Sequence, residues 1–321
     1  MHVPDEPNIG PVQAVAIVGA ALRFPGAADP SSFHDLSVTG QRMFRKLTRE
    51  TDGGQEPGRA DMAGTASAAL RPSLLAALLD EEKLDFRAGD PADGLTARHT
   101  LAAETAAAAL ADVPPAGRAV GVPAYAEIAG WSYGPAVLPQ RPLLAEAYLR
   151  AGIDPADIQF IEGHGAATAM EDAAELSALL EVLGPQLDGD GDRCALGSVS
   201  ANIGDTRAAA GVAALLKTAF AMTADVIPPS TGCVRPNRLL RGTGTPFRLL
   251  SAAEQWPQTP VQLAAVNTLG TAALPDAPRS GPVHIILRRE RDLARRPGRH
   301  RKPALLAAVG AAADIPRQAQ P

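Results

Sequence analysis

Apolar and polar positions along the chain alternate in a way that predicts both strands and helices. Residues 15–18 are a short apolar run closed by Gly19, which is typical of a strand buried on both faces of a sheet. Similar runs predict further strands at 158–162, 196–199, 263–269 and 283–287. The strands are separated by longer stretches with helical spacing, so the pattern predicts an α/β fold built in layers.

The amphipathic stretches carry helix signals at their ends. A stripe of four leucines ends at Gly184 and Pro185, which is a common way for a helix to stop. The stripe consists of Leu176, Leu179, Leu180 and Leu183. We expect further helices at 33–47 (weakly), 73–84, 97–111, 143–151 and 206–222.

Composition narrows the class of protein. Hydrophobic residues make up 46% of the 321 positions, enough to bury a sizeable core and to exclude wholesale disorder. Lys and Arg number 30 against 35 Asp and Glu, so the chain is mildly acidic and nucleic acid is not expected as a partner. No run approaches the roughly 18 apolar residues that a membrane span needs, so no membrane association is expected either.

Only two cysteines are present, which excludes a disulfide scaffold and a Cys-rich zinc site and fits a reducing compartment. We therefore expect a cytoplasmic protein without a metal site. A basic run at 288–302 precedes an Ala- and Pro-rich tail. Because no aromatic residues interleave with these charges, a solvated linker is favoured over a nucleic-acid patch.

Three collinear stretches resemble the β-ketoacyl synthase (ketosynthase) domains of modular polyketide synthases. Residues 15–30 look like the opening strand and Arg-Phe-Pro-Gly loop of that family. Residues 152–175 are similar to the segment with the His-Gly-Thr-Gly-Thr and Gly-Asp-Pro-x-Glu motifs, and residues 196–229 to the segment with Asn-Ile-Gly-His-Thr. The resemblance also covers residues 87–110 and implies a thiolase-like α/β layered fold.

The resemblance implies that this fold is incomplete, because most of its N-terminal half is deleted. Family members carry a nucleophilic Cys in a Thr-Ala-Cys-Ser-Ser turn, between segments like 101–110 and 124–135. Here the short stretch 112–123 joins those segments, so the nucleophile is missing. We divide the chain into a remnant of the N-terminal half (12–118), the C-terminal half (119–287) and a linker or tail (288–321). The deletion should leave apolar surface or a strand edge. Either residues 101–111 and the 112–123 connection cover it or a partner does, and we favour a partner.

The missing nucleophile matters for chemistry. In the family a Cys thiolate takes an acyl chain from a carrier protein, and without it no acyl-enzyme can form. Cys194 and Cys233 lie in other parts of the pattern, and we expect both to be small core or loop residues.

Catalytic histidines are only partly retained. His164 matches the first catalytic His, and Thr168 keeps the end of its motif, while Ala166 and Ala167 replace Thr-Gly. Asp205 stands at the position of the second His. A carboxylate cannot donate a hydrogen bond to an oxyanion, and losing one such donor costs about 10²–10³ in rate. Asp205 would instead suit the N-cap of the helix predicted at 206–222.

Other family positions are also changed. Lys217 and Glu175 match the charged pair of the family, and we expect a structural ion pair because their catalytic partner is gone. In the last motif Ala272 and Ala273 replace glycines, which restricts the backbone. His284 corresponds to the final His of that motif, at an altered spacing.

Three hypotheses about function remain open. The first is a truncated ketosynthase-like protein of polyketide or fatty acid-like biosynthesis that lacks condensing activity and binds an acyl carrier protein or an active ketosynthase subunit. The second is an enzyme that hydrolyses, decarboxylates or dehydrates a carrier-bound thioester, with His164 as general base beside Asp172, Glu175 or Asp205. The third is a nonfunctional remnant.

We expect no cofactor of the chain's own, because family substrates are carried on the phosphopantetheine of the carrier protein. A nucleotide-binding module is suggested by the strand that ends at Gly19. It is excluded because Ala20 and Ala21 follow, which breaks the G-x-G-x-x-G pattern.

Overall fold

A computed structural model describes residues 14–17, 20–46, 75–77, 124–134, 140–184, 194–206, 209–241, 245–269, 281–291, 304–306 and 309–312. Within these residues the helices are α1 (Pro30–Val38), α3 (Gln140–Ala151), α4 (Ala169–Leu183), α5 (Ser200–Ile203) and α6 (Ala210–Thr223), with 3₁₀ turns η3 (Pro155–Asp157) and η6 (Arg238–Leu240). The strands are β1 (Val15–Ile17), β2 (Ala20–Arg23), β3 (Phe44–Lys46), β4 (Leu75–Ala77), β5 (Ala126–Tyr133), β6 (Phe160–Glu162), β7 (Cys194–Gly197), β8 (Val226–Ile227), β9 (Phe247–Arg248), β10 (Glu254–Gln255), β11 (Val261–Thr268), β12 (Val283–Glu290), β13 (Ala304–Leu306) and β14 (Val309–Ala312).

Eight strands of the described chain form one mixed sheet in the order β13-β1-β5-β12-β11-β6-β7-β9. Strands β11, β6, β7 and β9 are parallel to one another, whereas β12 pairs antiparallel with both β11 and β5. Helix α4 returns the chain across the sheet between β6 and β7, as a parallel pair requires. The expectation that residues 15–18 join the main sheet is confirmed, since β1 pairs with β5.

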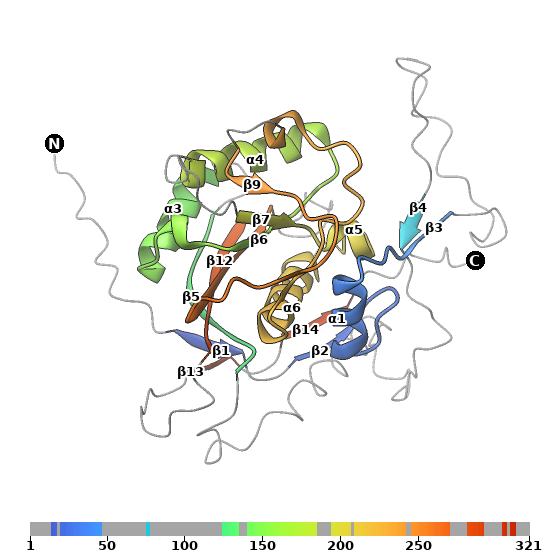
Figure 1. Cartoon of the computed structure of the whole chain (residues 1–321), viewed down its shortest axis with the longest axis horizontal. Helices are drawn as coiled ribbons and strands as arrows, with labels where there is room; N and C mark the ends of the chain where they lie inside the picture. Colours follow the sequence, from blue (N-terminus) through green and yellow to red (C-terminus); the bar gives the residue numbers. More distant parts are fainter. Residues whose placement is uncertain are drawn as a thin grey trace, which may run out of the picture.

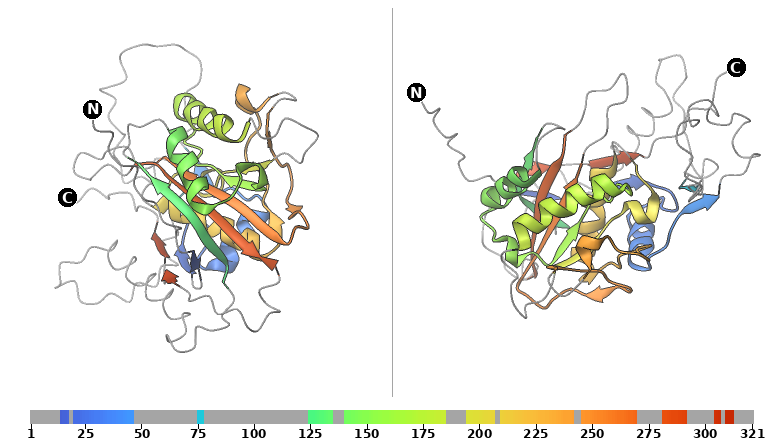
Figure 2. Two further views of the ribbon diagram at one scale, coloured as in Figure 1. Left: turned by 90° about the vertical axis from the view of Figure 1, so that its left-hand side faces the viewer. Right: turned by 90° about the horizontal axis from the view of Figure 1, so that it is seen from above.

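Side chains of the sheet alternate between two apolar layers, as the period of two along a strand requires. Along β11, Ala264 and Val266 face one cluster and Ala265 faces the other. Helices α3 and α4 cover one face of the sheet, and α6 with α1 lies on the opposite face (Figure 1). The turned views in Figure 2 show the sheet between these two helical layers.

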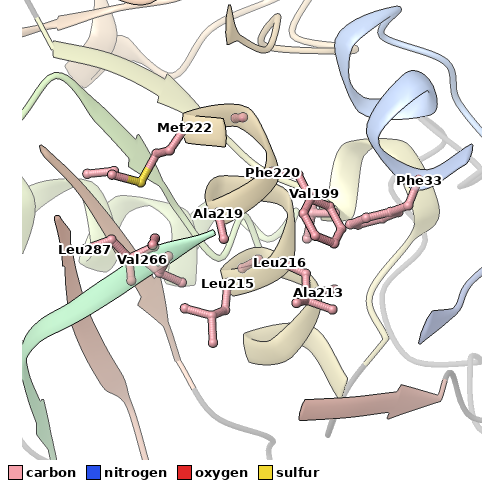
Figure 3. Close-up of a cluster of buried hydrophobic side chains, with 14 of the residues drawn as sticks. Phe33, Val199, Ala213, Leu215, Leu216, Ala219, Phe220, Met222, Val266 and Leu287 are labelled. Carbon is pink, nitrogen blue, oxygen red and sulfur yellow. The ribbon is translucent and has the colours of Figure 1, made fainter. Parts of the chain in front are cut away.

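Helix α6 is the centre of the larger cluster. Every side chain from Ala213 to Met222 is buried, and all of them are apolar except Lys217 and Thr218. Val266 and Leu287 approach it from the sheet, and on the other side the rings of Phe33 in α1 and Phe220 lie 6.4 Å apart (Figure 3). Within the described residues α1 therefore covers this helix.

Two predicted helices differ from the structure. The helix predicted at 33–47 is α1, which begins earlier and is shorter. It begins at Pro30 because Asp29 and Ser32 form a capping box, and the chain leaves the helix after Val38 to form β3. Residues Leu75–Ala77, inside the helix predicted at 73–84, form β4 and pair antiparallel with β3. Pairing with another strand overrides the weak helix preference of such a short segment.

The basic segment is not wholly a solvated linker. Strand β12 extends to Glu290, beyond the boundary predicted at 287, and Arg288 donates to Glu127 of the neighbouring strand. Arg289 donates to Gln262 of β11. Strands β13 and β14, from the predicted tail, pair in parallel with β1 and β2.

Several predictions lie outside the described residues. They concern the helix at 97–111, the connection at 112–123, and Ala272 and Ala273. Of the helices in the described part of the chain, none has both the length and the hydropathy needed to cross a membrane.

Candidate functional site

His164 lies in the loop that connects β6 to α4, and its side chain is partly exposed. The preceding strand is buried, so the loop emerges at the carboxyl end of a central parallel strand, where α/β folds place functional groups. Gly165 adopts the left-handed conformation, with φ +62°. A Cβ there would lie 2.5 Å from Ser198 Oγ, so both the backbone conformation and the available space require glycine.

Glu175 accepts hydrogen bonds from the backbone of this loop. Its side chain is only 4% exposed, and it accepts hydrogen bonds from the backbone N–H groups of His164 at 2.8 Å and Gly165 at 3.2 Å. The Nδ2 of Asn267, at the end of β11, donates to the same carboxylate at 2.7 Å. Three N–H donors satisfy a buried carboxylate without a cation. Glu175 therefore orients the His164 backbone.

Lys217 pairs with Glu162, so the expected ion pair with Glu175 is wrong. Lys217 Nζ lies 2.9 Å from Glu162 Oε2, and neither side chain is exposed to solvent. Glu162 ends β6 and Lys217 lies in the middle of α6, so the geometry of sheet and helix brings them together. Burial raises the pKa of Glu162, and the Lys217 ammonium offsets part of that effect.

A second loop, residues 198–206, packs against the first. The hydroxyls of Ser198 and Ser200 both donate to the backbone oxygen of His164, at 2.9 and 3.0 Å. Asn202 Nδ2 donates to the backbone oxygen of Gln41, which ties this loop to the segment after α1. These hydrogen bonds thus tie the second loop both to the His164 loop and to the segment after α1.

Asp205 is exposed in the second loop and does not cap a helix. Helix α6 begins at Ala210, and its N-cap, Ala209, makes no side-chain hydrogen bond. The N-cap prediction is wrong because Gly204, with φ +82°, ends α5 in a left-handed turn. The chain then needs several more residues before α6 can begin.

His284 lies in β12, fully buried beneath the site. Its Nδ1 faces Asn267 Oδ1 at 3.2 Å, and since the Nδ2 of that amide donates to Glu175, His284 is the donor in this contact. Burial lowers the pKa of His284 to about 3. Sequence reasoning named His284 and Glu175 but missed Asn267 and Glu162. The position of Glu162 just before Gly163 and His164 was the available signal.

Neither cysteine has the environment of a reactive nucleophile. Cys194 is buried in β7 among apolar side chains, and burial strongly raises the pKa of its thiol. Cys233 is exposed in a loop, and partial burial raises the pKa of its thiol too. A raised pKa keeps a thiol protonated and therefore weakly nucleophilic. Among the described residues no group of three or more His, Cys, Asp or Glu side chains is arranged to hold a metal ion.

Comparison with known proteins identifies the class. Residues 132–233 match the family of β-ketoacyl synthase C-terminal domains, and this segment contains His164, Glu175, Asp205 and Lys217. This part of the chain is therefore similar to the ketosynthase domains of polyketide synthases, and the structure has an α/β thiolase-like fold, as the sequence resemblance implied.

The relatives include polyketide synthases that are much longer than this chain. A highly reducing polyketide synthase of Penicillium rubens is 33% identical over 136 residues, which is 42% of this chain and 5% of that synthase. Polyketide synthase GfsE of Streptomyces halstedii is 36% identical over 152 residues, which is 45% of this chain and 4% of that protein. The chain thus spans only a small part of the curated relatives it matches.

Two solved structures support the fold. The ketosynthase from module 6 of the bacillaene synthase of Bacillus subtilis 168 has a TM-score of 0.63 at 18% identity, over 86% of this chain and 70% of that one. An oxazolomycin ketosynthase domain of Streptomyces albus JA3453 has a TM-score of 0.56 at 22% identity, over 95% of this chain and 100% of that one. At this identity the likeness establishes the fold.

Proposed function

We propose that the chain is a ketosynthase-like protein of polyketide biosynthesis that lacks condensing activity and binds a phosphopantetheine-bearing acyl carrier protein. The similarity to polyketide synthases supports this context. The observation that carries the proposal is an intact scaffold with altered reactive groups. Glu175 holds the His164 loop and Glu162 keeps its buried pair with Lys217, while Asp205 replaces a hydrogen-bond donor and both thiols are kept protonated.

Retention of the scaffold favours a binding role over a remnant. A buried ion pair or carboxylate lowers the stability of a fold unless its partners are held in place. The Glu162–Lys217 pair and the three donors on Glu175 therefore favour an intact fold around them. A binding protein needs the shape of the two loops but not a thiolate. The chain has kept the groups that shape the loops and lacks a thiolate, and this combination fits a binding role.

The test combines a binding measurement with a chemical one. We expect saturable binding of the holo carrier protein by isothermal titration calorimetry, and weaker binding of the apo form that lacks phosphopantetheine. Incubation with an acyl-pantetheine thioester should leave the intact mass unchanged. Asp205→His should not restore condensation, because the nucleophile is still missing.

Two results would contradict the proposal. One is a covalent acyl adduct on Cys194 or Cys233 with turnover that Cys→Ser substitution removes. The other is failure of both holo and apo carrier proteins, and of an active ketosynthase from the same pathway, to bind the chain.

A second candidate is an enzyme that uses His164 as a general base toward a carrier-bound thioester. The observation in its favour is that the Asp172 carboxylate lies close enough to His164 to interact electrostatically. The hydroxyls of Ser198 and Ser200 donate to the backbone oxygen of His164, so water would have to be the nucleophile. Release of free acid from an acyl-pantetheine thioester, lost in His164→Ala, would favour this candidate.

A further inference from the structure

The backbone amides of the His164 loop converge on two carboxylates of α4. The N–H groups of His164 and Gly165 donate to Glu175, and the N–H of Ala167 donates to Asp172 Oδ1 at 3.2 Å. Consecutive amides in this arrangement form a concave anion-binding surface, and here the protein's own carboxylates fill it.

Ala167 adopts a backbone conformation that is unfavourable for a residue with a Cβ. Its φ is +61°, in the left-handed region where an L-residue with a Cβ is strained. Gly165, two residues earlier, has nearly the same φ without this penalty. The family resemblance places a glycine where Ala167 stands. The left-handed conformation of Ala167 therefore requires a compensating contact.

In the described structure the Asp172 carboxylate accepts the hydrogen bond from the Ala167 N–H. It lies in the first turn of α4, which Thr168 caps by accepting a hydrogen bond from the N–H of Glu171. The loop and the start of α4 therefore form one hydrogen-bonded unit. Glu171 and His164 are the charged or titratable groups that face Asp172.

We propose that Asp172 is a positioning residue for His164, because its carboxylate holds Ala167 in the left-handed conformation and so preserves the loop shape after the loss of glycine. Asp172 acts on the loop backbone, and Glu175 holds the other half. The inference concerns the loop itself and is independent of the proposed function.

Amide hydrogen exchange measured by NMR on the full chain tests this. Asp172→Ala is expected to speed exchange at the Ala167 amide about tenfold, because the strained conformation loses its partner. Exchange at the His164 and Gly165 amides, which Glu175 holds, should change by less than about threefold. The ring Cε1–Hε1 resonance of His164 should also shift, since the loop that carries the ring is released.

Rescue by glycine distinguishes positioning from a general loss of stability. In the Ala167→Gly background, where the left-handed conformation carries no strain, Asp172→Ala should leave the His164 resonance in place, although the amide of residue 167 loses its acceptor in either background. Ala166→Gly is the matched control, because Ala166 does not have a positive φ and should give no rescue. Asp172→Asn, which keeps an acceptor oxygen, should resemble the parent.

The proposal is overturned if Asp172→Ala leaves exchange at Ala167 within about twofold of the parent. It is equally overturned if Ala166→Gly rescues as well as Ala167→Gly. Asp172→Ser provides the same comparison should the alanine variant fail to fold, since Ser is too short to reach the amide in the same way.

Discussion

Glu162 and Glu175 are both buried near His164, yet they have different partners. Glu175 accepts three N–H groups, whereas Glu162 pairs with the Lys217 ammonium. The sequence identified Glu175 and Lys217 as structurally important but paired them with each other. The correct pairing depends on which face of β6 meets α6, and that is a property of the assembled layers.

Removing the cation of the buried pair should be strongly destabilising. Lys217→Met leaves the Glu162 carboxylate buried without its partner, so we expect a loss of about 3–5 kcal/mol in the free energy of unfolding. Urea denaturation monitored by circular dichroism measures it. The double variant with Glu162→Gln should recover much of the loss.

The control is an exposed ion pair on the other layer. Arg141 and Glu181 have side chains that are 65% and 59% exposed, so Arg141→Met should cost less than about 0.5 kcal/mol. Equal urea midpoints for Lys217→Met and the parent would show that the buried pair contributes nothing to stability.

His284 should make the fold sensitive to mild acid. Its pKa is about 3 in the folded chain and 6.5 when exposed, so between these values the unfolded state binds a proton that the folded state does not. The stability due to His284 is therefore full above pH 6.5 and falls by about 2 kcal/mol on going from pH 6.5 to 5.

Urea unfolding at several pH values, in parent and His284→Gln, isolates this contribution because the other titrating groups cancel in the difference. We expect the variant to have a flatter dependence on pH over this range. Parallel curves for the two proteins would mean that His284 does not titrate differently on unfolding.

At the scale of elements, the strands of the second half of the chain were largely predictable. β6, β7, β11 and β12 are apolar runs between turn residues, and they were expected within a few positions of their observed bounds. β5 was not predicted as a strand, because Gly130 and Ser132 interrupt its apolar pattern. The reason for Gly130 becomes visible only with α3 in place, since that helix packs closely on β5.

Gly130→Ala should separate α3 from the sheet. A Cβ at this position would lie 2.7 Å from Ala151 N and 2.8 Å from Ala147 O, both backbone atoms of α3. Backbone cannot move aside as a flexible side chain does, so we expect a loss of about 1–3 kcal/mol in unfolding free energy. Thermal denaturation measures it.

Gly184→Ala is the matched control for this substitution. A Cβ there meets nothing within 4 Å, and φ is −56°, which any L-residue adopts. It should be neutral or stabilise by up to about 1 kcal/mol. A Gly130→Ala protein as stable as the Gly184→Ala protein would contradict the close packing of α3.

At the scale of the whole molecule, the layered α/β arrangement followed from the sequence, but the packing of α1 over α6 did not. The weak helical pattern of residues 33–47 gave no sign that its first turns would pack on α6. Phe33 is fully buried, with its ring centroid 5.1 Å from that of Phe24 and 6.4 Å from that of Phe220. Which helix covers which depends on aromatic contacts between distant segments.

Phe33→Ala should therefore weaken the whole fold and not only α1. The substitution removes the aromatic contact between α1 and α6, and we expect a loss of about 3–5 kcal/mol. Tyr133→Ala is the control, because Tyr133 is 76% exposed and its loss should stay within about 0.5 kcal/mol of the parent. Chemical denaturation compares them, and similar midpoints would exclude α1 as the cover of α6.

The pairing of β1 with β13 has a consequence for the order of folding. Val15 lies opposite Ala304, so nearly the whole chain separates the two partners, whereas β6, α4 and β7 follow one another directly. Closing so long a loop costs entropy before any contact repays it, and such pairings form slowly. We expect the parallel strands from β6 to β9 to acquire protection first in pulse-labelled refolding. The β1 edge of the sheet should then be the last part to close.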